Sequence, residues 1–115
     1  MIATAPSVLD FEDVLVHIQE VAADPDFDPT YSHFVDFSAV KKMKISGEQM
    51  RELARRDIFD HGAKRAAYAP QLLVYGFARM YALYREVFGG KKLRVFRDRD
   101  AALAWLFDTE MRKAG

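Results

Sequence analysis

The feature that most constrains the fold is an alternation of short β-prone segments with longer helical segments. Apolar residues recur at helical spacing in four segments, at about 11–23, 47–61, 71–88 and 99–107. Between them lie short strand-like segments at 33–37, 65–69 and 93–96, and a weaker one at 2–5. Strands that alternate with helices pair in parallel through right-handed crossovers. The sequence therefore predicts an α/β fold with an open, mostly parallel sheet of three to five strands and about four helices.

Length and composition indicate one folded domain over residues 1–115. Half of the residues are hydrophobic and 30% are charged, which excludes wholesale disorder. The chain has no cysteine, so disulfides and thiolate chemistry are excluded, and a reducing compartment is expected. No apolar run approaches the ~20 residues of a membrane span, and the first residues carry no basic cluster. We therefore expect a cytoplasmic protein.

The charges are balanced in total but unevenly distributed. There are 17 basic and 17 acidic residues, yet residues 1–36 carry eight acidic residues and no Lys or Arg, so the remainder has a charge of +8. This asymmetry is explained by a solvated acidic helix and loop, or by an acidic partner or head-to-tail self-association. Because zero net charge does not provide the broad positive field that attracts nucleic acid, no nucleic-acid partner is expected.

A family resemblance rests on several short motifs. They are Phe27-Asp28-Pro29, Val35-Asp36, Arg65-Ala66-Ala67, Tyr75-Gly76-Phe77-Ala78-Arg79-Met80, Val95-Phe96-Arg97-Asp98 and Ala101-Ala102-Leu103-Ala104-Trp105-Leu106. With them the chain resembles the SpoIIAA-like family from about residue 9 to residue 107. That family is similar to the STAS fold of bacterial anti-sigma factor antagonists, and shares a topology with Sec14-type lipid-binding domains. Typical members have one or two strands before the first helix, where this chain has barely nine residues.

The resemblance implies a non-catalytic binding or regulatory module that acts through protein–protein interaction. The alternative is a small-ligand carrier, for a lipid or an anionic nucleotide, related to the Sec14-type fold. A carrier requires an apolar pocket of a few hundred Å³, and a domain of this size is expected to have little volume to spare, so the carrier is the second choice. A protein partner is expected in the first case and a small-molecule ligand in the second.

Ser46 is the residue that the resemblance singles out. In STAS-type antagonists a strand-ending Asp leads to a serine and a glycine at a helix start, and that serine is phosphorylated. Here Asp36 leads to Ser46-Gly47, but Lys44-Ile45 stands where those proteins have Asp-Ser. The segment Ser46-Gly47-Glu48-Gln49 also reads as a capping box, which explains Ser46 without any modification.

The same segment suggests an anion site. Its candidate residues are Lys41, Lys42, Lys44, Ser46 and Gly47. Lysines beside free backbone N–H groups at a helix start are able to hold a phosphate or a lipid headgroup. The other interpretation is a solvated basic loop, which we favour because no glycine-rich phosphate cradle accompanies the lysines.

The long helix at about 71–88 presents two faces. Helical spacing predicts a broad core face, formed by Leu73, Gly76, Phe77, Met80, Leu83, Tyr84, Val87 and Phe88. The predicted interface residues on the other side are Tyr75, Ala78, Arg79, Ala82 and Glu86. Tyr and Arg are favoured at interfaces and small alanines permit close approach, so this stripe predicts a homodimer. The alternative, which the sequence favours equally, is that Arg79 anchors a neighbouring loop.

The sequence does not establish an enzyme, and no catalytic residue, cofactor or metal is predicted. Polar residues at the expected carboxyl ends of strands are Asp36, Ser38, Gln71, Arg97 and Asp98, with no histidine placed to activate the serine. The segment 24–29 has alternate carboxylates but lacks the Gly and Glu of a calcium loop. His17, His33 and His61 are scattered and are expected to be structural or solvated.

Overall fold

The computed structural model describes residues 2–28, 32–56, 64–88 and 93–114, with side chains described up to residue 107. Its strands are β1 (Ile2–Thr4), β2 (Val8–Asp10), β3 (His33–Asp36), β4 (Lys42–Lys44), β5 (Arg65–Tyr68) and β6 (Leu93–Phe96). Its helices are α1 (Phe11–Ala23), α2 (Gly47–Arg55), α3 (Leu72–Val87) and α4 (Arg99–Ala114). The predicted α/β class is confirmed.

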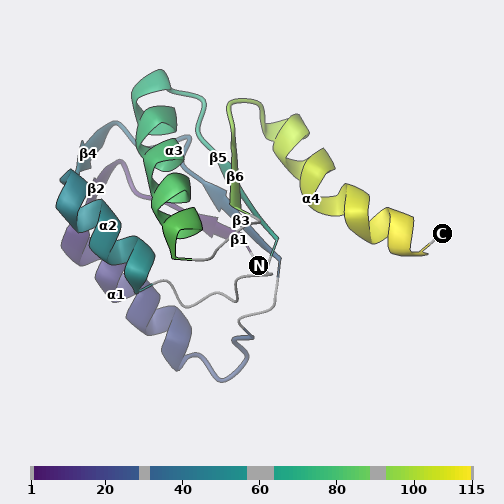
Figure 1. Ribbon diagram of the computed structural model, residues 1–115, viewed down its shortest axis with the longest axis horizontal. Helices are drawn as coiled ribbons and strands as arrows, with labels where there is room; N and C mark the ends of the chain where they lie inside the picture. The colour runs from purple at the N-terminus through teal and green to yellow at the C-terminus, as the bar shows by residue number, and fades with distance from the viewer. Residues whose placement is uncertain (1, 29–31, 57–63, 89–92, 115) are drawn as a thin grey trace.

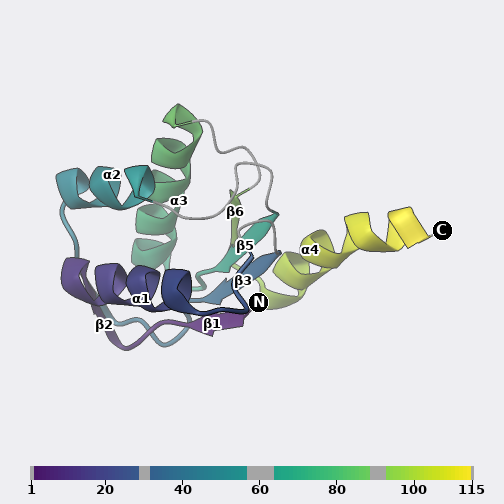
Figure 2. The ribbon, with the colours of Figure 1, turned by 90° about the horizontal axis from the view of Figure 1, so that it is seen from below.

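Four strands form one parallel sheet in the order β1-β3-β5-β6. Each crossover between neighbouring strands contains one helix, and the sheet grows in a single direction. Right-handed crossovers then place α1, α2 and α3 on the same face of the sheet. Figure 1 shows this arrangement, with α4 alone on the opposite side, and Figure 2 shows the same layers from below. The weak strand expected at 2–5 is present as the edge strand β1.

The two faces of the sheet have separate cores. On the face of α1, α2 and α3, the buried residues are Leu9, Val40, Ile45, Met50, Leu53, Ala69 and Val74. On the face of α4 they are Phe34, Ala66, Ala102 and Leu106. Trp105 adds to the second core, where its ring centroid lies 5.7 Å from that of Phe96. Lys64 stabilises the packing of α4, because its ammonium donates to the Trp105 carbonyl and lies 4.4 Å from the centre of the indole ring.

Helix starts are fixed by side-chain caps. The Asp10 carboxylate accepts from the backbone N–H of Asp13 at 2.8 Å, and α1 follows directly. At α2 the predicted capping box is present, with Ser46 Oγ accepting from the N–H of Gln49 at 3.1 Å and Gln49 Oε1 accepting in return at 3.0 Å. The Asp98 carboxylate accepts from the N–H of Asp100 at 3.2 Å at the start of α4. A side-chain cap thus marks the start of each of α1, α2 and α4.

The predicted core face of the long helix is wrong in part. Phe77 and Tyr84 are half-buried as expected, but the following predicted core side chains are exposed: Leu73, Met80, Leu83 and Val87. The side that faces the sheet and α2 instead carries Val74, Ala78, Tyr81 and Arg85. Apolar residues surround α3 on nearly every side, so their spacing alone did not orient it. In α4, Phe107 was also expected to face inward, and its side chain is 49% exposed.

A second, two-stranded parallel sheet was not predicted. It pairs β2 with β4, so the basic segment 42–44, expected to be a loop, is a strand whose central residue Met43 turns inward. The sequence predicts the second helix as far as residue 61, and this is wrong: α2 ends at Arg55, and Arg56, with φ −89° and ψ 3°, is its C-cap. The positions His61-Gly62, Gly89-Gly90 and Ile58 lie outside the described residues.

Candidate functional site

A cavity of about 400 Å³ lies on the three-helix face of the sheet. It is lined by residues of β1, β3, β5 and β6 on one side and by residues of α1, α2, α3 and the β2–β4 pair on the others. Its volume lies in the usual range for small-molecule sites, about 300–1,000 Å³. The expectation that so small a domain has little volume to spare is therefore wrong.

The cavity exists because α1 is not packed closely on the four-stranded sheet. In α1, all of whose residues are described, none is buried. The helix packs against α2 and β2, while its inward residues Val14, Ile18 and Val21 line the cavity. The facing strand residues include the small Ala3 and Ala67, which leave open the space that larger side chains would fill.

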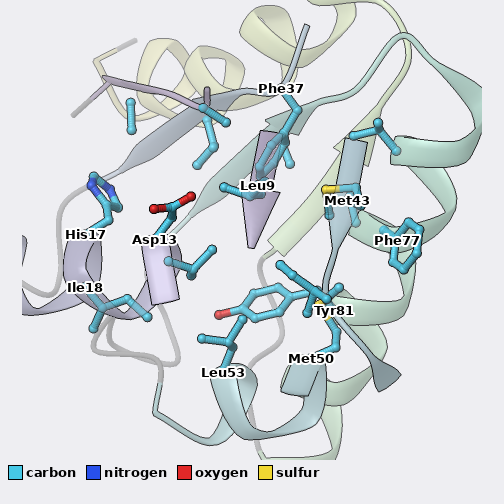
Figure 3. A pocket seen from close by; sticks show the side chains of 18 of the residues that line it. Leu9, Asp13, His17, Ile18, Phe37, Met43, Met50, Leu53, Phe77 and Tyr81 are labelled. Carbon is cyan, nitrogen blue, oxygen red and sulfur yellow. The ribbon is translucent and has the colours of Figure 1, made fainter. Parts of the chain in front are cut away.

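Most of the remaining lining is apolar and deformable. Figure 3 shows Met43 and Phe77 on one side of the cavity, with Met50, Leu53 and Tyr81 nearby. Methionine thioethers and aromatic rings adapt to irregular apolar shapes, which suits a site that takes a hydrocarbon or aromatic group.

A few polar side chains interrupt this lining. Asp13 and His17 project from α1 on the opposite side of the cavity from Met43 and Phe77 (Figure 3), and both are exposed, so this part of the lining reaches the surface. His33 and Arg65 lie on the sheet and are only 4% and 9% exposed. His33 was expected to be structural or solvated, and it is buried, whereas His61 lies outside the described residues.

The sheet arranges these polar residues in a row. His33 and Arg65 are the first residues of β3 and β5 and are partners in the parallel register. The next inward-facing row, two residues along the strands, consists of Ala3, Val35 and Ala67. On the sheet side of the cavity, the two polar residues thus lie where β3 and β5 begin, beside Leu93 at the start of β6, and the next row is apolar.

The predicted anion-site residues gather at the start of α2. Lys41, Lys42 and Lys44 are exposed, as are Ser46 and Gly47. Ser46 acts as a cap, as described above. The N–H groups of Lys41 and Lys42 both donate to the carbonyl of Ser7, the residue directly before β2. Met43 and Ile45 of this segment line the cavity, but the three lysines, Ser46 and Gly47 are not among the lining residues.

The predicted interface residues of α3 do not share one surface. Arg79 and Glu86 are exposed, and Tyr75 and Ala82 are half-buried, but Ala78 lines the cavity. The predicted contact between Tyr75 and Arg79 is present, since the guanidinium donates to the phenol oxygen at 3.2 Å and lies 5.9 Å from the ring centre.

The polar residues at the carboxyl ends of the strands have structural contacts. Asp36 Oδ1 accepts from the N–H of Ser38 at 2.8 Å, which closes a turn after β3. Arg97 donates to the Pro70 carbonyl at 3.3 Å, and Asp98 caps α4. In the part of the chain that the structure describes, no group of three or more His, Cys, Asp or Glu side chains is placed to hold a metal ion.

The clearest electrostatic cluster lies on the surface of α2. Glu52 accepts from Arg55 at 2.5 and 3.0 Å and from Arg56 at 2.6 Å. These hydrogen bonds, first that of Arg55 and then that of Arg56, lower the pKa of the Glu52 carboxyl from 4.5 to about 2. The hydrogen bond with Glu52 in turn raises the pKa of Arg55. None of these three residues is among those that line the cavity, so the cluster stabilises the helix.

Comparisons with family models, curated proteins and solved structures gave no match to this chain. The resemblance to the SpoIIAA-like family therefore stays a prediction. None of the helices within the described ranges combines the length and the apolar character that a membrane crossing requires.

The cavity was missed at the level of sequence, as was Arg65. One signal was available, because Arg65 is a charged residue at the head of an otherwise apolar strand segment that ends at Pro70. A charge in a buried strand is uncommon and points either to a paired structural role or to a site.

Proposed function

We propose that this domain binds a small, largely apolar molecule in the cavity between the four-stranded sheet and helices α1, α2 and α3. The observation that carries the proposal is the cavity itself, about 400 Å³ in volume and lined mainly by apolar side chains. Sites for small molecules are typically apolar hollows with a few polar groups that orient the ligand. This is the carrier function that sequence reasoning placed second.

The SpoIIAA-like resemblance is compatible with this function, since the fold it implies is shared with Sec14-type lipid-binding domains. The cysteine-free composition fits a reducing compartment, so we propose the cytoplasm as the place of action.

Calorimetric titration of the full chain with 1-octanol tests the proposal, using the wild type and the variant Ala67→Leu. Ala67 is 4% exposed and lines the cavity, so a leucine there occupies part of the space that the ligand needs. We expect binding to the wild type and at least about tenfold weaker binding to the variant, a difference of about 1.4 kcal/mol.

Ala104→Leu is the matched control. Ala104 is exposed on α4, on the other side of the sheet, so the same substitution there leaves the cavity unchanged. Equal binding to the wild type and to both variants would place octanol elsewhere, and no binding to any of them would refute the proposal. Native mass spectrometry of protein purified gently from its own host would then identify the natural ligand.

A second function is favoured by the exposed side of α3. Leu72, Met80, Leu83 and Val87 recur at helical spacing on this side, and Leu83 and Val87 are 56% and 74% exposed. Gly76, which lies between Leu72 and Met80 on this side, is also exposed and permits close approach of another helix. We propose that a second copy of this chain covers this stripe, which preserves the expected homodimer but centres its interface on these apolar residues, with Arg79 at its edge.

Sedimentation velocity tests the homodimer. The wild type should sediment as a dimer at micromolar concentration, and Leu83→Glu should sediment as a monomer with an unchanged circular dichroism spectrum, because a charge at the centre of the stripe opposes burial. Glu20→Gln, at an exposed position on α1, should leave the dimer intact. A monomeric wild type would refute this second function, and a heterologous protein partner would then be the remaining form of the binding-module prediction.

A further inference from the structure

We propose that the ligand of the cavity is an apolar monocarboxylate, with its carboxylate held by Arg65 and His33 and its hydrocarbon or aromatic body along the inner rows of the sheet. This inference rests on the proposed function, since it assigns the chemical class of the molecule that the cavity takes.

The first argument is the position of a permanent charge. Arg65 is only 9% exposed, and it lines the cavity. An arginine side chain does not lose its proton in proteins, so its positive charge persists in this apolar setting. It also carries five N–H donors, so it is able to keep a partner within the protein and still offer donors to a ligand.

The second argument is the pairing of Arg65 with His33. The two residues are register partners on adjacent parallel strands and both line the cavity, so their side chains leave the same face of the sheet on strands about 4.8 Å apart. Neutral histidine offers one ring N–H donor and protonated histidine offers two. An arginine fork and an imidazole side by side match the two oxygens of a carboxylate.

The third argument is the polarity gradient of the cavity wall. The polar row is followed along the strands by Ala3, Val35 and Ala67, about 6.6 Å further on, and this row has no polar side chain. Beyond it the lining includes Phe37 and Met43. A ligand with one anionic end and an apolar body matches both parts of the wall, whereas a neutral hydrocarbon makes no charge-assisted hydrogen bond with Arg65.

Asp13 and His17 do not supply an equivalent head-group site. Both lie on α1 and are exposed, so any charge they carry is screened by water. The Asp13 carboxylate would moreover repel an anionic head, which favours orientation of the carboxylate toward the sheet rather than toward α1.

The experiment compares three ligands with the same eight-carbon tail and different heads: octanoate, 1-octanol and octylamine. Each is titrated calorimetrically into the full chain at pH 7. We expect octanoate to bind at least about tenfold more tightly than 1-octanol, and octylamine, which is a cation at this pH, to bind more weakly than both. Octanoate binding equal to or weaker than 1-octanol binding would overturn the inference and leave the proposed apolar site in place. Failure of all three ligands to bind would instead refute the proposed function itself.

Variants locate the head group. Arg65→Gln should reduce octanoate binding to the level of 1-octanol and leave 1-octanol binding unchanged. Arg85→Gln is the matched control, because Arg85 is also an arginine with only 4% exposure, but it donates to the Ala54 carbonyl at 3.2 Å and is not part of the cavity lining. An equal loss of octanoate binding in both variants, or of both ligands in Arg65→Gln, would overturn the assignment to Arg65.

If Arg65→Gln does not fold, a second variant tests the assignment. Arg65→Lys then replaces it, since lysine retains the positive charge but lacks the planar fork that binds a carboxylate through two bonds. We expect this variant to bind octanoate several-fold more weakly than the wild type and 1-octanol equally well. Unchanged octanoate binding in Arg65→Lys would overturn the assignment of the carboxylate to Arg65.

Discussion

At the scale of single residues, Ser46 shows how a position that resembles a regulatory site already has a structural task. Its hydroxyl accepts from the N–H of Gln49 and its own N–H donates to the Gln49 side chain, so both partners of the capping box are in use. A capping hydroxyl compensates one of the backbone donors that every helix start leaves without an intrahelical partner. The lysines around it do not alter that task.

Ser46→Ala should lower the free energy of unfolding by about 1 kcal/mol, because alanine removes the cap. Urea denaturation followed by circular dichroism measures this difference. Ser46→Asp is the control, since aspartate is as good a cap as serine and its charge favours the helix start, and its stability should stay near that of the wild type. Equal losses in the two variants would show that the hydroxyl has a role beyond capping.

At the scale of elements, α2 carries a pH-dependent contribution to stability. The Glu52 carboxyl has a pKa of about 2 in the folded protein against an ordinary value of 4.5, because Arg55 and Arg56 bind its charged form. A carboxyl with a lowered pKa stabilises the fold above its unfolded pKa, and this stabilisation is lost as the pH falls through the folded value. The contribution is therefore complete above about pH 5 and disappears toward about pH 2.

Glu52→Gln should accordingly melt at a slightly lower temperature than the wild type at neutral pH, and the difference should shrink between about pH 5 and pH 2. The effect is small because the ion pairs are exposed and screened. Melting temperatures across this pH range measure it, and 1 M salt should reduce it at neutral pH. Glu48→Gln, which removes a charge from the first turn of α2 without removing these arginine contacts, should not reproduce the same profile.

The order and type of the elements could largely be predicted from sequence, but their orientation could not. Caps and apolar spacing located the starts of α1 and α2 correctly, since both helices have one clear apolar side, but α2 ends earlier than predicted. In α3 the outward Leu83 and the inward Val74 are equally apolar, and only the position of the sheet decides between them. The strands β2 and β4 were missed because three residues are too few to establish an alternating pattern.

At the scale of the whole molecule, the two layers differ in how closely they pack, although their residues are similar. Ala66 and Ala67 are neighbours in β5 and point to opposite faces. On the face of Ala66, helix α4 approaches closely enough that Ala66 and Ala102 have no exposed surface. On the face of Ala67, the helices stand off and leave the cavity. The candidate site could not be predicted because nothing in the pair Ala66-Ala67 distinguishes a tight layer from an open one.

The same substitution at both positions measures this difference. Ala66→Leu forces three additional carbon atoms into a filled layer and should lower the free energy of unfolding by about 1–3 kcal/mol. Ala67→Leu places the same atoms in the cavity, where they bury apolar surface, and should leave stability unchanged or raise it by up to about 2 kcal/mol. Urea denaturation without ligand gives both values. Similar losses in the two variants would mean that the three-helix layer is as closely packed as the other and has no room for a ligand, so this comparison tests the cavity independently of any binding measurement.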